Sequence, residues 1–124
     1  MKEIWYVGIG GFFGSVLRHL INVISYRSYP IQIIPYGTLF VNCIGCFLLG
    51  ISVALFKKYN LNIESLNLLL ITGFLGAFTT FSAFGNESIK LFFSNQYQIF
   101  FGNILLNVSL SIFSVWLGYL RVSY

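Results

Sequence analysis

Long stretches without a charged residue decide what this chain can fold into. No charged side chain occurs in residues 28–56, 65–86 or 91–120, which are runs of 29, 22 and 30 residues. Each run exceeds the roughly 20 residues that a membrane-spanning helix needs. Only 8% of the 124 residues are charged and 57% are hydrophobic, and a soluble domain of this size must cover a large surface with polar groups. The composition therefore excludes a soluble monomer, a disordered chain and a nucleic-acid-binding domain, and it predicts an integral membrane protein.

The first apolar segment, residues 4–26, contains one arginine, Arg18. A cleaved signal peptide is the competing interpretation of such a segment. No small-residue cleavage pattern follows the apolar stretch, and Glu3 is unusual in a basic leader. We therefore expect an uncleaved helix.

Together these segments predict a single all-α transmembrane domain over residues 1–124. We expect its four helices at about 4–26, 33–56, 66–93 and 98–120. All tyrosines and tryptophans fall near an end of a predicted span, as expected for residues that favour the membrane–water interface. A multi-pass protein of the cell membrane is the simplest interpretation.

The basic residues are almost evenly divided between the two predicted membrane faces. The side that carries both termini has Lys2, Lys57, Lys58 and Arg121, and the other side has Arg27 and Lys90. Since orientation follows the excess of Lys and Arg on one side, so small a bias predicts insertion in both orientations.

Four short helices leave little room to enclose a pathway, so the polar residues within them would face lipid in a monomer. Because intramembrane polar groups normally face protein or water, we expect a homo-oligomer. Dual insertion makes an antiparallel homodimer possible. The pairs Gly10/Gly14 and Gly73/Ala77 have the spacing that lets helices approach closely.

Polar residues recur at helical spacing in the second and fourth spans. Thr38 and Asn42 share a face of the second, where Asn42 predicts either an interhelical hydrogen bond or an N–H donor for a passing anion. The fourth span carries a polar stripe that indicates the wall of an ion-accessible track; its members are Asn103, Asn107, Ser111 and Ser114.

Arg18 lies within the first predicted span. It predicts either a side chain that reaches the interface or a fixed positive charge beside an anion path.

The third span has unusual chemistry at residues 73–85. Gly73, Gly76 and the pair Thr79-Thr80 weaken a helix, and this predicts a break at mid-membrane, although a continuous helix with tolerated glycines is the alternative. Freed carbonyls at such a break can coordinate a cation such as sodium. Phe81 and Phe84 follow, and such rings usually pack in a core or against lipid. Their electropositive ring edges could instead face an anion.

No residues suggest an enzyme. Nucleophile–base pairs, phosphate loops and paired carboxylates are absent from the sequence, and Glu3, Glu64 and Glu87 fall at predicted helix ends. Cys43 and Cys46 have no further cysteine or nearby histidine in the sequence, which favours structural thiols over a metal or redox site.

Three stretches together resemble the CrcB/Fluc fluoride channel family. GGFFGSVLR at 10–18 is similar to its first-helix motif, GTLFVNCIG at 37–45 to its second and GFLGAFTTFSAF at 73–84 to its third. They occur in order, one in each of three predicted helices. The fourth helix is less similar, because Asn103 and Asn107 stand where the family often has an aromatic hydroxyl and a serine.

The resemblance implies a passive, fluoride-selective channel that lowers intracellular fluoride toxicity, built as an antiparallel, dual-topology homodimer with two pathways. It implies that Asn42, Phe81 and Phe84 line the pathway, with Arg18 near its entrance. Thr38 and side chains of the polar stripe, including Asn107 and Ser111, would also belong to the fluoride pathway. It further implies a structural sodium ion held by the carbonyls of Gly76 and Thr79.

Two other functions compete. A small multidrug transporter also has four short spans, but proton-coupled export of cations needs an acidic residue deep in a span, where the first helix has Arg18. A non-transporting assembly subunit would explain the hydrophobicity, but it leaves the polar stripe of the fourth span and the Thr79-Thr80 pair without a purpose.

Overall fold

The structure, a computed structural model, describes residues 1–28, 35–61 and 63–123. Its regular elements, in chain order, are α1 (Lys2–Ser28), α2 (Tyr36–Lys58), α3 (Glu64–Asn67), the π-helical η1 (Leu68–Leu75), α4 (Gly76–Phe78), α5 (Phe81–Phe93) and α6 (Tyr97–Ser123). All of the regular elements in the described residues are therefore helical.

In the part of the chain that the structure describes, four helical stretches are long and apolar enough to cross a membrane: Lys2–Arg27, Tyr36–Lys58, Glu64–Phe93 and Tyr97–Ser123. The third combines α3, η1, α4 and α5. The start expected for the second helix at residues 33 and 34 lies outside the described residues. The chain is a multi-pass membrane protein.

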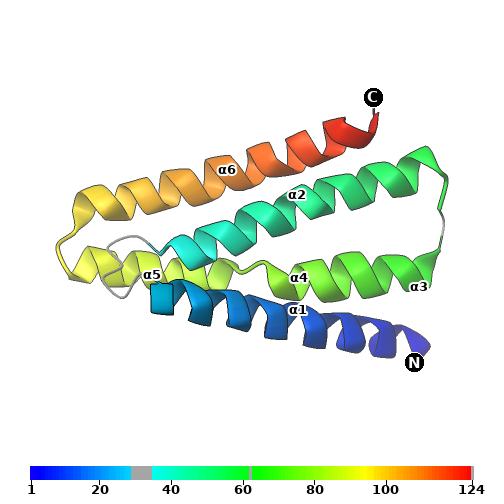
Figure 1. Cartoon of the computed structure of the whole chain (residues 1–124), viewed down its shortest axis with the longest axis horizontal. Coiled ribbons are helices and arrows are strands. Elements are labelled where there is room, and N and C mark those ends of the chain that lie inside the picture. The colour runs from blue at the N-terminus through cyan, green and yellow to red at the C-terminus, as the bar shows by residue number, and fades with distance from the viewer. Residues whose placement is uncertain (29–34, 62, 124) are drawn as a thin grey trace.

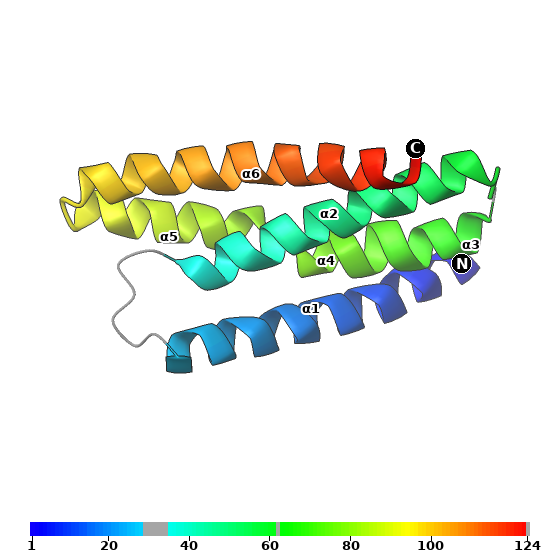
Figure 2. The same cartoon turned by 45° about the horizontal axis from the view of Figure 1, so that its top comes forward.

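The helices pair in two groups. α2 lies along α6, and α1 lies along η1 and α4 on the other side of the bundle (Figure 1). Turning the molecule shows α1 diverging from the other helices toward its C-terminal end (Figure 2). Both termini lie at the same end of the bundle, next to the connection between α2 and α3 (Figure 1).

Glycines set how closely these pairs approach. A Cβ added at Gly50 of α2 would overlap the Val115 carbonyl oxygen of α6, and one added at Gly118 would overlap the carbonyl oxygen of Phe47. Gly10 and Gly73 lie against each other between α1 and η1 in the same way. The small-residue pairs Gly10/Gly14 and Gly73/Ala77 therefore serve packing within one chain.

Asparagines end two of the helices. Asn60 after α2 and Asn95 after α5 adopt φ values of 47° and 57°, the left-handed conformation that asparagine tolerates better than most residues. At each end the next residue donates back into the last turn: Leu61 N–H to the Phe56 carbonyl at 2.9 Å, and Gln96 N–H to the Leu91 carbonyl at 3.0 Å. Both are Schellman caps, which satisfy carbonyls at the helix ends.

Helical winding is interrupted at Thr79 and Thr80, between α4 and α5 (Figure 1). Both residues have extended dihedrals, with φ and ψ of −75° and 154° at Thr79 and −149° and 118° at Thr80. Thr80 then caps α5, because its hydroxyl accepts a hydrogen bond from Ala83 N–H at 3.2 Å. The local chemistry of threonine, which bonds its own backbone readily, suits this position.

The interior of the bundle contains both polar and apolar side chains, and its outside is largely apolar. Within residues 1–28, 35–61 and 63–123, seven polar residues are buried: Thr38, Asn42, Ser52, Thr80, Ser88, Asn103 and Asn107. Large apolar side chains such as Leu105 and Ile112, each 67% exposed, cover the surface. Soluble proteins rarely expose so many large apolar side chains, but such a surface is expected where the outside of the bundle meets lipid or a partner helix.

Candidate functional site

A cleft of about 280 Å³ opens beside the interruption between α4 and α5. It is bounded by α2, α5 and α6, and its walls are Asn42, Cys46, Thr79, Thr80, Phe81, Phe84, Asn107, Val108, Ser111 and Ile112. None of these residues is acidic. The cleft thus combines hydroxyls, side-chain amides and aromatic rings without a fixed negative charge.

Asn42 holds the extended backbone at Thr80. The Thr80 N–H donates to Asn42 Oδ1 at 2.8 Å, and Asn42 Nδ2 donates back to the Thr80 carbonyl at 3.2 Å. An extended residue presents its N–H and C=O on the same side, as in the closely spaced pairs of an antiparallel sheet. The side-chain amide of Asn42 therefore takes the place of a neighbouring strand.

The polar stripe of α6 continues this network. Asn42 Nδ2 also donates to Asn107 Oδ1 at 3.1 Å, and Asn107 Nδ2 donates to Asn103 Oδ1 at 2.9 Å. Asn103 Nδ2 donates in turn to Ser88 Oγ of α5 at 3.0 Å. Both amide hydrogens of Asn42 have acceptors within the chain, so the expected interhelical hydrogen bond is present.

Phe81 and Phe84 occupy different environments on α5. Phe84 is buried, whereas the Phe81 side chain is 79% exposed. Their ring centroids lie 5.2 Å apart with the planes inclined by 65°, an edge-to-face arrangement. The edge of such a ring is electropositive, so the pair can present positive ring edges to the cleft.

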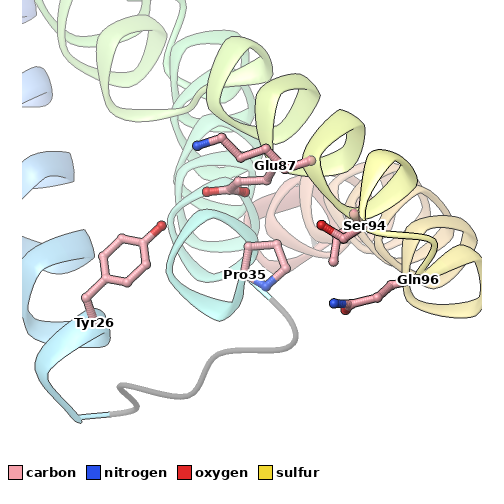
Figure 3. A pocket seen from close by; sticks show the side chains of 7 residues that line it. Tyr26, Pro35, Glu87, Ser94 and Gln96 are labelled. Carbon is pink, nitrogen blue, oxygen red and sulfur yellow. The ribbon is translucent and has the colours of Figure 1, made fainter.

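A second, more polar cavity of about 240 Å³ lies between α1 and α5, at the end of the bundle away from the termini. Figure 3 shows Tyr26 pointing into it opposite Glu87, with Pro35, Ser94 and Gln96 around the remaining wall. The hydroxyl of Thr38 in α2 donates to Glu87 Oε1 at 2.6 Å. Glu87 therefore pairs across the bundle with a side chain of α2.

Sequence comparisons agree with this architecture. The family model described as "CrcB-like protein, Camphor Resistance (CrcB)" matches residues 5–119. The chain belongs to the CrcB family. A relative from Flavobacterium psychrophilum is 42% identical over 118 residues, which cover 95% of this chain and 94% of the relative.

Other CrcB relatives are equally similar. One from Campylobacter jejuni is 44% identical over 115 residues, 92% of each chain, and one from Azobacteroides pseudotrichonymphae is 40% identical over 124 residues, 100% of this chain and 98% of the relative. All three relatives are named fluoride-specific ion channel FluC.

In this CrcB chain the cleft brings together six of the residues singled out from the sequence: Asn42, Thr79, Phe81, Phe84, Asn107 and Ser111. Thr38 lies apart, bonded to Glu87 beside the second cavity. Arg18 is partly exposed on α1 and lines neither cavity, and Gly76 begins α4 just before the interruption.

Sequence reasoning missed two members of the site region. Ser88 is buried and accepts from Asn103, but a single serine in an apolar helix gives no signal of its partner 15 residues away. Cys46 was expected to be a structural thiol, whereas it is only half-buried and lines the cleft. Its spacing of four from Asn42 places both on one face of α2, which was the available signal.

Proposed function

We propose that this chain is a fluoride-specific ion channel that releases fluoride from the cell passively. The observation that carries the proposal is the cleft, in which hydroxyls, amides and phenyl edges gather without an acidic residue in a chain of the CrcB family. The names of the relatives support fluoride as the ion. An ion channel of this kind is not an enzyme.

The chemistry of fluoride suits the cleft. A small, strongly hydrated anion enters a narrow path only where hydrogen-bond donors replace its water. The hydroxyls of Thr80 and Ser111 are such donors on opposite walls, and the edges of Phe81 and Phe84 add positive potential. Asn42 and Asn107 line the same cleft. Thr38 would lie at the far end of the path, beside the second cavity, where its hydroxyl donates to Glu87. Arg18 would supply positive potential near the entrance.

We also propose that two chains form an antiparallel homodimer with two fluoride pathways. The cleft is open on one side, and the ring of Phe81 is largely uncovered within the single chain. In lipid an open polar cleft needs protein or water to cover it. A second copy in the opposite orientation would close it, and the even distribution of basic residues agrees with dual insertion.

A structural sodium ion beside the interruption fits the carbonyls present. In a continuous helix Gly76 C=O would accept from Thr80 N–H, but that N–H donates to Asn42. Thr79 C=O would accept from Ala83 N–H, but that N–H donates to the Thr80 hydroxyl. Both carbonyls are therefore left with lone pairs for a hard cation, which would supply fixed positive charge at mid-membrane.

The sodium proposal has its own test. Replacing sodium by N-methylglucamine in the purified protein should lower its thermal unfolding temperature, and restoring sodium should reverse the change. An unfolding temperature that is independent of sodium would contradict a structural ion.

The proposed location is the plasma membrane, where passive exit protects the cell because HF enters as a neutral acid and dissociates inside. The test is growth on fluoride of a bacterium that lacks its own fluoride exporter. Expression of this chain should restore growth and lower retained fluoride, whereas the Phe81→Ile variant should do neither. Growth no better than with an empty vector, despite chain in the membrane, would contradict the proposal.

A further inference from the structure

A relay of side-chain amides joins α2, α6 and α5 inside the bundle. It runs from Asn42 through Asn107 and Asn103 to Ser88, in three hydrogen bonds of 3.1, 2.9 and 3.0 Å. All four side chains are buried, with 2–8% of each exposed. Only Asn42 and Asn107 line the cleft, so Asn103 and Ser88 lie behind its wall.

Backbone groups determine the direction of this relay. The Thr80 N–H can only donate, so Oδ1 of Asn42 must face it and Nδ2 must face Asn107. The Asn103 backbone carbonyl can only accept, and Asn107 Nδ2 donates to it at 3.2 Å. The Asn103 side chain must then present Oδ1 to Asn107 and Nδ2 to Ser88.

The orientation of each amide therefore depends on its neighbour. Without an acceptor at position 88, the Asn103 Nδ2 is a buried donor with no partner, and only the bond from Asn107 still fixes the Asn103 side chain. A less firmly fixed Asn103 holds the Asn107 amide less firmly, and Asn107 Oδ1 then accepts less well from Asn42. Hydrogen bonds in such chains polarise one another in a low-dielectric interior, which strengthens this dependence.

We propose that Ser88 and Asn103 are positioning residues that act through Asn107 on Asn42. They hold the Asn107 amide where it accepts from Asn42 Nδ2, and so steady the Asn42 side chain whose orientation the Thr80 backbone sets. The effect on fluoride flux rests on the proposed function, whereas the effect on Asn42 does not.

The test replaces Ser88 and observes Asn42 directly. In protein labelled with ¹⁵N-asparagine and held in lipid nanodiscs, the side-chain amide signals of Asn42 are assigned by their loss in Asn42→Ala. Ser88→Ala should shift these signals and speed their exchange with solvent by about tenfold, the effect of losing one buried hydrogen bond. Ser88→Thr keeps the hydroxyl and should restore the native signals.

A matched control is Ser52→Ala, which removes another buried hydroxyl, one that bonds only the Leu48 carbonyl of its own helix. Its Asn42 signals should stay native. If Ser88→Ala does not fold, Ser88→Cys keeps the shape of the side chain with a slightly larger and weaker acceptor, and it should give a smaller shift in the same direction. Unchanged Asn42 signals in a folded Ser88 variant would overturn the relay.

Flux measurements separate this proposal from the proposed function. Fluoride efflux should fall in Ser88→Ala and recover in Ser88→Thr, in parallel with the Asn42 signals. If the native protein shows no fluoride efflux, the proposed channel function is wrong, and the Asn42 amide signals alone decide whether the relay exists. Shifted signals with native efflux would overturn the claim that this positioning serves fluoride.

Discussion

Asn42 of α2 and Thr80 of the interruption between α4 and α5 are joined by a reciprocal pair of hydrogen bonds, with donor–acceptor distances of 2.8 and 3.2 Å. The pair satisfies a stretch of backbone that has left the helix, and it does so inside a bundle that faces lipid. An unpaired N–H or C=O there would cost several kcal/mol. The interruption between α4 and α5 is thus tolerated because α2 supplies a side chain shaped like a peptide group.

The first prediction concerns Asn42→Asp. A carboxylate can still accept from Thr80 N–H, but it loses both bonds that Nδ2 donates and places a negative charge in the cleft. We expect fluoride efflux to fall by about tenfold or more and the free energy of unfolding to fall by ~1–3 kcal/mol. Asn67→Asp is the control, because Asn67 is exposed on α3. Native efflux in Asn42→Asp would remove this residue from the pathway.

The second prediction concerns the ring of Phe81. Because this side chain is 79% exposed within the chain, Phe81→Ile should leave the helices folded. It removes an electropositive edge from the cleft, and we expect efflux to fall by at least about tenfold, which corresponds to ~1.4 kcal/mol. Phe93 of the same helix is 76% exposed and lines neither described cavity, so Phe93→Ile should conduct normally. Equal efflux in the two variants would contradict the assigned role.

The third prediction uses the native cysteines as probes. Cys46 lines the cleft, whereas Cys43 faces a separate apolar groove beside Tyr36 and Leu39. A small mercurial should therefore block efflux by reacting with Cys46. Cys46→Ser should be resistant and Cys43→Ser should remain sensitive. The reverse pattern would place the path on the other side of α2.

The fourth prediction tests the contact between α2 and α6. A methyl group at Gly50 would overlap the Val115 carbonyl, and relief requires the helices to separate. We expect Gly50→Ala to destabilise the fold by ~1–3 kcal/mol, as overpacking usually does. A Cβ added at Gly102 of α6 would meet nothing within 4 Å, so Gly102→Ala should leave the stability unchanged or raise it by up to ~1 kcal/mol, the difference in helix propensity. Thermal unfolding in detergent compares the two, and equal stability would refute the close approach.

Much of the fold follows from local sequence. Uncharged runs such as 91–120 predict a span because hydrocarbon excludes charge, and α6 covers residues 97–120 of that run. The weakness of residues 73–85 was readable from glycine and threonine chemistry, and extended dihedrals occur there at Thr79 and Thr80. Helix ends were less predictable, because caps such as Asn60 depend on hydrogen bonds to the preceding turn.

The partners of polar residues could not be predicted in the same way. Spacing placed Thr38 and Asn42 on one face of a helix, but their partners Glu87 and Asn107 are 49 and 65 residues away along the chain. Which faces meet depends on the glycine contacts that set helix separation. The stripe on α6 was visible, whereas its hydrogen bond from Asn42 required the packed bundle.

The most direct test of the account is fluoride efflux from liposomes that contain the purified protein and potassium fluoride. A fluoride electrode records release with and without valinomycin, and parallel liposomes hold chloride. The account predicts rapid fluoride release that depends on valinomycin, because the ion crosses alone and carries charge, with chloride retained. Fluoride held back by a folded protein, or chloride released at a similar rate, would contradict it.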